Sequence, residues 1–93
     1  MQVKVPYMNN SNKNEAYGKV KNTITPDLLA KWKVNADLSY KDNQEITAAG
    51  KGFTLTLIFE ETEIIADLNL SFLLKPLGKK ILEKIEHQIK KVV

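Results

Sequence analysis

Apolar and polar side chains alternate along two neighbouring segments in the second half of the chain. From Phe53 to Phe59 every second residue is a large apolar one, with mostly polar residues between. After a polar stretch at Glu61-Thr62 the same pattern returns from Ile64 to Leu70. A period of two residues is typical of a β-strand with one buried face. The two segments therefore predict a hairpin with one apolar face and one mostly polar face.

Three further segments have patterns typical of strands. Gln2 to Tyr7 alternates and contains a proline near its end, so we expect it at an edge of the sheet. Ala36 to Tyr40 and Glu45 to Ala49 alternate on either side of a polar turn and predict a second hairpin. Gly50-Lys51-Gly52 fits either a loose turn or a bulge, and we favour a bulge inside one long strand. The sequence thus predicts about four strands.

An apolar residue recurs at every fourth position between Glu15 and Lys33, which predicts an amphipathic helix. The stripe consists of Ala16, Val20, Ile24, Leu28 and Trp32. Pro26 interrupts it, and Thr25 is suited to cap a second segment that begins at this proline. One kinked helix and two short helices both remain open. The preceding stretch from Met8 to Asn14 contains four asparagines and a serine, a loop composition that can cap the first helix.

The carboxyl-terminal segment predicts the clearest two-faced helix. Its apolar arc comprises Leu77, Ile81, Leu82, Ile85, Ile89, Val92 and Val93. Because one face of the sheet is apolar, we expect the helices to cover that face. Ninety-three residues give room for one domain only. The prediction is a single α+β domain over residues 1–93, an antiparallel sheet of about four strands with two helices on one face, in the order β-α-β-β-β-α.

The composition narrows the range of partners and locations. All 14 basic residues are lysine, 11 acidic residues are interspersed among them, and the net charge is +3. Lysine lacks the planar fork that reads guanine or grips phosphate, so we expect no nucleic-acid partner. The absence of cysteine excludes disulfides and thiolate metal sites. Apolar runs are too short to span a bilayer or form a signal peptide, so we expect a cytoplasmic protein without a transmembrane segment.

No residue pattern predicts a catalytic, cofactor-binding or metal site. His87 falls on the polar face of the last helix, where a solvated side chain is expected. The acidic run at 60–63 lacks the oxygen spacing of a calcium loop and fits the tip of a hairpin. Trp32 is expected in the core, with an interface role as the second interpretation. With no nucleophile or enclosed carboxylate pair, the sequence favours a protein that is not an enzyme and has no cofactor.

The connection between the last strand and the last helix carries the strongest candidate for partner binding. Alternation stops there, so three adjacent bulky residues cannot all point into one core, and at least one is expected on the surface. Nearby lysines would suit docking to an apolar surface with anionic character. The alternative is that these residues close the end of the core. The candidate surface comprises Phe72, Leu73, Leu74, Lys75, Lys79 and Lys80.

Several motifs after residue 35 occur together in a known family. They are Leu38-Ser39-Tyr40, the run from Ala49 to Phe53, the run from Asp67 to Pro76, and the helical segment from Lys80 to Ile85. The set resembles the polyhydroxyalkanoic acid system proteins, small bacterial proteins associated with polyester storage-granule gene clusters. The first 35 residues depart from that family, whose first helix is uninterrupted. The resemblance implies a bacterial cytoplasmic protein on or near a polyhydroxyalkanoate granule, and it brings no catalytic residues.

Two hypotheses of different class follow. The preferred one is a non-enzymatic granule-associated or regulatory binding protein that engages a polyhydroxyalkanoate granule surface or a granule-associated protein. The alternative is a small carrier of an apolar ligand, with a cavity between sheet and last helix as in helix-grip folds. A void lined by Phe53, Leu55, Leu68 and Leu70 would favour the carrier. An exposed edge at Val3 to Pro6 is also compatible with a homodimer.

Overall fold

A computed structural model describes residues 1–8, 12–32, 34–72 and 74–93 of the chain. Over these residues, five strands form one antiparallel sheet. The strands are β1 (Gln2–Pro6), β2 (Ala36–Lys41), β3 (Glu45–Gly50), β4 (Phe53–Phe59) and β5 (Glu63–Leu70). The helices are α1 (Lys13–Thr23), α2 (Pro26–Lys31), the 3-10 helix η1 (Lys75–Leu77) and α3 (Gly78–Lys90). The predicted α+β class is confirmed, with one strand more than expected.

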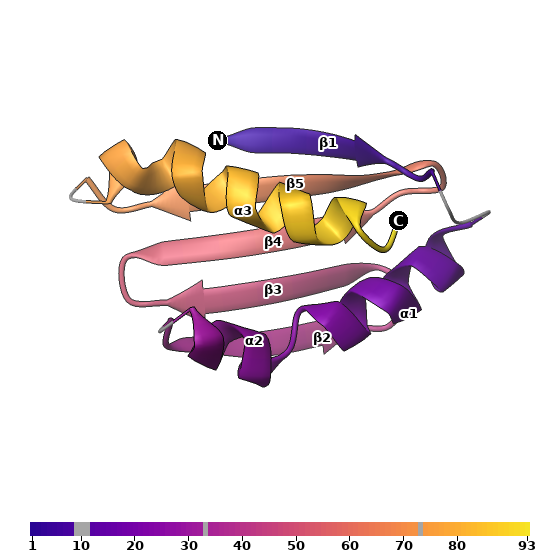
Figure 1. The fold of residues 1–93 in the computed structure, drawn as a ribbon, viewed down its shortest axis with the longest axis horizontal. Helices are drawn as coiled ribbons and strands as arrows, with labels where there is room; N and C mark the ends of the chain where they lie inside the picture. The colour runs from indigo at the N-terminus through magenta and orange to yellow at the C-terminus, as the bar shows by residue number, and fades with distance from the viewer. Residues whose placement is uncertain (9–11, 33, 73) are drawn as a thin grey trace.

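The sheet has the order β1-β5-β4-β3-β2, so β1 lies at one edge and β2 at the other. Strands β2 to β5 follow one another as hairpins. Strand β1 pairs with β5, with Pro6 opposite Glu63, and the connection through α1 and α2 leads from β1 across the sheet to β2 at the other edge. Figure 1 shows the helices in front of the sheet, α3 along the side of β1 and β5, and α1 and α2 along the side of β2. The helices therefore cover one face, as the alternation predicts.

The favoured bulge at Gly50-Lys51-Gly52 is wrong, because the chain reverses direction there. Gly50 pairs with Phe53, which leaves Lys51 and Gly52 as a two-residue hairpin loop. Gly52 has φ +86°, a conformation that glycine adopts without the steric cost of a Cβ. A Cβ at Gly50 would lie 2.2 Å from the ring of Phe53. Both glycines thus serve a tight turn, which divides the expected long strand into β3 and β4.

The core lies between the apolar face of the sheet and the helices. Leu57 of β4 is opposite Ala66 of β5, and both are buried, as the two alternating patterns predict. Helix α1 packs on β4 through Tyr17, whose ring meets that of Phe59 edge to face at 5.3 Å. The main core residues that α3 contributes are Leu82, Ile85, Ile89 and, just beyond its end, Val93.

Two capping side chains define where the first helices begin. The side-chain oxygen of Asn12 accepts a hydrogen bond from the backbone N–H of Glu15 at 2.9 Å. The hydroxyl of Thr25 accepts one from the N–H of Leu28 at 3.3 Å, and Pro26 opens α2. The segment is therefore two short helices. Because the second helix restarts at the proline, its buried residue is Leu29, whereas Leu28 is half-buried.

Leu77 does not belong to the apolar face of α3, contrary to the prediction from helical spacing. It ends η1, the 3-10 turn that precedes the helix, and its side chain is 49% exposed. A 3-10 turn has three residues rather than 3.6, so a residue before Gly78 does not continue the arc of the α-helix. The apolar face that covers the sheet therefore begins at Ile81 and Leu82.

Candidate functional site

The connection from β5 to α3 places one aromatic side chain in solvent. Phe72 is 85% exposed, whereas Leu74 is half-buried and packs toward the β3–β4 turn. The Cδ1 atom of Leu74 lies 3.0 Å from the position that a Cβ on Gly52 would occupy. Leu73 lies outside the described residues. Of the two bulky residues described here, Phe72 is exposed, as predicted for at least one of them, and Leu74 is half-buried.

Backbone hydrogen bonds hold this connection against the neighbouring hairpin turn. The N–H of Ser71 donates to the carbonyl of Gly52 at 2.7 Å. The N–H groups of Leu74 and Lys75 both donate to the carbonyl of Ser71, at 3.0 and 3.1 Å. Turn backbone that is paired in this way resists rearrangement, because each bond would have to be exchanged for one to water. Phe72 is therefore exposed on a turn whose backbone is held by hydrogen bonds.

Three lysines follow the exposed aromatic residue closely in the sequence. Lys75, Lys79 and Lys80 are all exposed, and none forms an ion pair with an acidic residue of the described ranges. The half-exposed Leu77 lies between them in the sequence. We call this region the Phe72 surface, which comprises Phe72, Leu74, Lys75, Leu77, Lys79 and Lys80. It combines apolar area with three positive charges.

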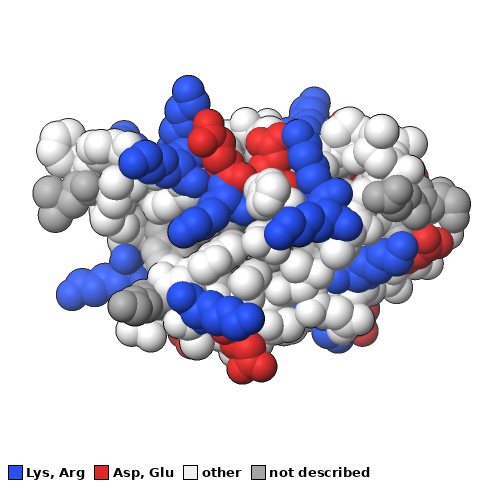
Figure 2. All heavy atoms as spheres, in the orientation of Figure 1, with Lys and Arg blue, Asp and Glu red and all other residues white. Residues whose placement is uncertain are grey.

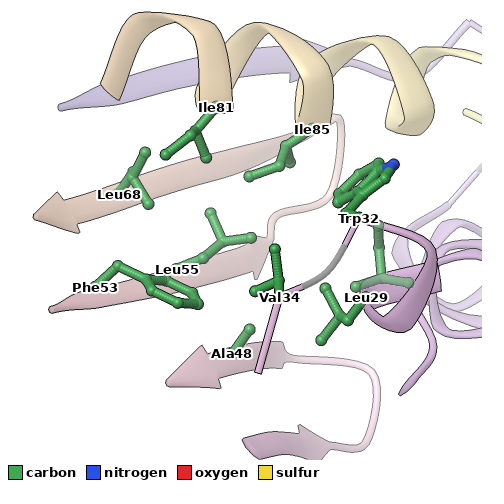
Figure 3. A pocket seen from close by; sticks show the side chains of 10 residues that line it. Leu29, Trp32, Val34, Ala48, Phe53, Leu55, Leu68, Ile81 and Ile85 are labelled. Carbon is green, nitrogen blue, oxygen red and sulfur yellow. The ribbon is translucent and has the colours of Figure 1, made fainter. Parts of the chain in front are cut away.

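A second feature is a cavity of about 100 Å³ between the sheet, the end of α2 and α3. Figure 3 shows Leu55 and Leu68 rising from the sheet, Ile81 and Ile85 descending from α3, and Trp32 closing a third side. The other lining residues are Ile24, Leu29, Val34, Ala48 and Phe53. Every lining side chain is aliphatic or aromatic, and the only polar group among them, the indole nitrogen of Trp32, points away from the cavity in Figure 3.

The lining set agrees only in part with the sequence-based hypothesis for a carrier. Phe53, Leu55 and Leu68 line the cavity as that hypothesis requires, but Leu70 does not. Leu70 is at the end of β5 and lies over the start of α3, where its Cδ1 would be 2.8 Å from a Cβ on Gly78. The space itself arises partly from the small side chain of Ala48, which is opposite Leu55 in the sheet.

The mouth of the cavity carries a positive charge. The ammonium nitrogen of Lys84 lies 5.7 Å from the centre of the Trp32 ring, a distance typical of a cation–π contact. Trp32 is half-buried and packs against the core, as expected. Figure 2 shows that the centre of this face of the molecule is largely uncharged, with lysine side chains on either side. Helical spacing alone missed the role of Lys84, because its partner comes from a segment about fifty residues earlier.

The remaining polar candidates have structural surroundings. His87 is exposed on α3, as predicted, and within the described ranges no three His, Asp or Glu side chains gather as a metal site would require. The tip of the β4–β5 hairpin holds Glu60 and Glu61, which confirms the prediction of a turn there. Burial, followed by the charges of Glu61, Glu60 and Glu63, raises the pKa of Tyr7 to about 12. Its hydroxyl donates to the carbonyl of Glu60 at 2.7 Å and ties the end of β1 to this tip.

Comparisons with family models, curated proteins and solved structures found no match to the chain. The resemblance to the polyhydroxyalkanoic acid system proteins therefore depends on the motifs quoted above. In the part of the chain that the structure describes, none of the helices has the length and apolar character that a membrane crossing requires. The two sites to be explained are thus the Phe72 surface and the apolar cavity.

Proposed function

We propose that this chain is a non-enzymatic binding protein that docks on a polyhydroxyalkanoate granule surface, or on a granule-associated protein, through the Phe72 surface. The observation that carries the proposal is the 85% exposure of Phe72. Burying such a side chain is favourable by roughly 1.5 to 3 kcal/mol, which is available only when a partner covers it. The family resemblance supplies the polyester as the partner, and a bacterial cytoplasm as the location.

The lysines of the Phe72 surface give the docking an electrostatic component. Lys75, Lys79 and Lys80 would be attracted to carboxylate end groups or other anions at the granule boundary. Exposed charges are screened over about 10 Å at 0.1 M salt, so this component weakens as the salt concentration rises. The apolar component does not weaken in this way. Docking is therefore expected to decrease with salt without disappearing.

One Phe72 surface gives only weak binding. Burial of Phe72 contributes roughly 1.5 to 3 kcal/mol, whereas a dissociation constant of 1 mM already corresponds to a binding free energy of about 4 kcal/mol. Two copies of the surface on one particle would bind far more tightly, because the second contact becomes intramolecular. The edge position of β1 supports such an arrangement, with the free side of Val3 to Pro6 pairing between two chains. A homodimer of this kind is part of the proposal.

Co-sedimentation with polyhydroxybutyrate particles tests the proposal. We expect wild type to sediment with the particles and Phe72→Ser to remain in the supernatant. Met8→Ser is the matched control, because Met8 is 83% exposed outside the Phe72 surface. Circular dichroism establishes that each variant is folded. Absence of wild-type binding, or equal loss in both variants, would contradict docking through Phe72.

A further inference from the structure

The apolar cavity beneath α3 lies outside the Phe72 surface, and its size suits a small ligand. Its volume is about 100 Å³. An engineered protein cavity of about 150 Å³ with a similar aliphatic and aromatic lining binds benzene, which has six carbon atoms. By proportion, the present cavity accommodates an apolar group of about four carbons. This space is larger than the voids left by ordinary close packing.

The same lining excludes a polar group from the interior. A hydroxyl or carboxylate placed among Leu55, Leu68 and Ile85 would lose its hydrogen bonds to water and find no partner. Trp32, Val34 and Ile81 each remain partly exposed, so the cavity reaches solvent beside them. A ligand with a polar end must therefore keep that end at this mouth.

The charges at the mouth indicate the sign of that polar end. Helix α3 carries Lys80 and Lys84 one turn apart, next to Ile81, which lines the cavity. The ammonium group of Lys84 contacts the outer wall through the Trp32 ring. Neither lysine forms an ion pair with the acidic residues described, although Glu83 lies in the same shallow groove. An anionic end group can thus be received there by a charge-assisted hydrogen bond.

We propose that the cavity binds a small carboxylate with an unbranched apolar tail, the tail enclosed between Leu55 and Ile85 and the carboxylate beside Lys84. None of the residues that line the cavity belongs to the Phe72 surface. The carboxylate contact is assigned to Lys84, which lies outside that surface, and Lys80 is the one residue near both sites. It makes this chain a carrier or sensor of short fatty acids. A neutral molecule of the same length would fill the cavity but lack the contact with Lys84.

Intrinsic fluorescence provides a direct test, because Trp32 is the only tryptophan and it lines the cavity. We expect hexanoate to change the emission in a saturable manner, and acetate, which has no tail, to leave it unchanged at the same concentration. Hexylammonium has the same tail with the opposite charge and should bind at least tenfold more weakly than hexanoate. Equal binding of hexanoate and hexylammonium, or a response to acetate equal to that to hexanoate, would overturn the proposal.

Two substitutions separate the roles of charge and cavity. Lys84→Gln should weaken hexanoate binding roughly tenfold, whereas Lys41→Gln, the same change at an exposed position on β2, should leave it unaltered. Ala48→Leu fills the cavity and should abolish binding, with folding checked by circular dichroism. If that variant does not fold, Ile81→Phe narrows the cavity from its partly exposed side. Unchanged binding in Lys84→Gln or in the folded cavity variant would overturn the assignment.

Discussion

Replacing Ile89 with alanine is expected to lower the free energy of unfolding by about 3 to 4 kcal/mol. Ile89 is 0% exposed on the face of α3 that covers the sheet. The substitution deletes three carbon atoms, which at about 0.8 kcal/mol for each buried CH₂ group gives about 2.4 kcal/mol. The space left behind adds roughly 1 kcal/mol. For a domain of this size, whose stability is about 5 to 14 kcal/mol, the loss is a quarter or more.

Urea unfolding followed by far-UV circular dichroism measures this loss, and thermal melting should show a decrease of roughly 12 to 30 °C in Tm. Leu77→Ala is the matched control, because it also deletes three carbons in the same part of the chain. Leu77 is 49% exposed, so its truncation should cost less than about 1 kcal/mol. In this packing of α3 on the sheet, Ile89 is buried and Leu77 is exposed. Equal losses of unfolding free energy in the two variants would therefore refute it.

Backbone conformation and proton linkage give two further predictions. Gly52→Ala should destabilise by about 1 to 2 kcal/mol because φ is +86° there, whereas Gly18→Ala should stabilise by about 0.5 to 1 kcal/mol because its Cβ would meet no atom within 4 Å in α1. Thermal melts of the two variants should therefore shift in opposite directions, and shifts of one sign would contradict the turn. The pKa of Tyr7, raised to about 12 from 10.0, means that the folded state retains a proton that the unfolded state releases, so stability is full below pH 10.0 and falls as the pH rises toward 12. Tyr7→Phe should make this fall shallower in urea midpoints measured against pH, and an unchanged slope would argue against the linkage.

Sequence patterns predicted the fold correctly wherever a pattern is compatible with one local structure only. The alternation from Ile64 to Leu70 defined the buried face of β5, and the cap at Thr25 with Pro26 defined the start of α2. The glycines at 50 and 52 were ambiguous, because a bulge and a tight turn use the same residues. The antiparallel pairing of β3 with β4, Gly50 with Phe53 and Ala48 with Leu55, distinguishes the two, and that pairing depends on contacts across the sheet.

Of the two candidate sites, one follows from a local sequence pattern and the other depends on tertiary packing. The end of alternation at Phe72 correctly predicted that an apolar side chain would be exposed. The cavity could not be predicted in full, because its volume depends on the distance between α2 and α3. The hydrophobic periodicity of each helix contains no information on that distance. Trp32 and Ile81 line it together although they are far apart in the sequence. The one local signal was Ala48, which is smaller than Ile46, the other buried residue of β3.

The pairing of β1 with β5 has a consequence for how the chain reaches its fold. Each hairpin from β2 to β5 closes a short loop, whereas β1 must wait until the segment from Glu63 onward is present. Closing that longer loop costs roughly 2 kcal/mol more in chain entropy than closing a four-residue turn. The first of the five strands in this sequence is therefore expected to dock last. During that interval the β5 edge of a second copy is an equivalent partner for β1, so concentrated refolding favours exchange of this strand between two chains.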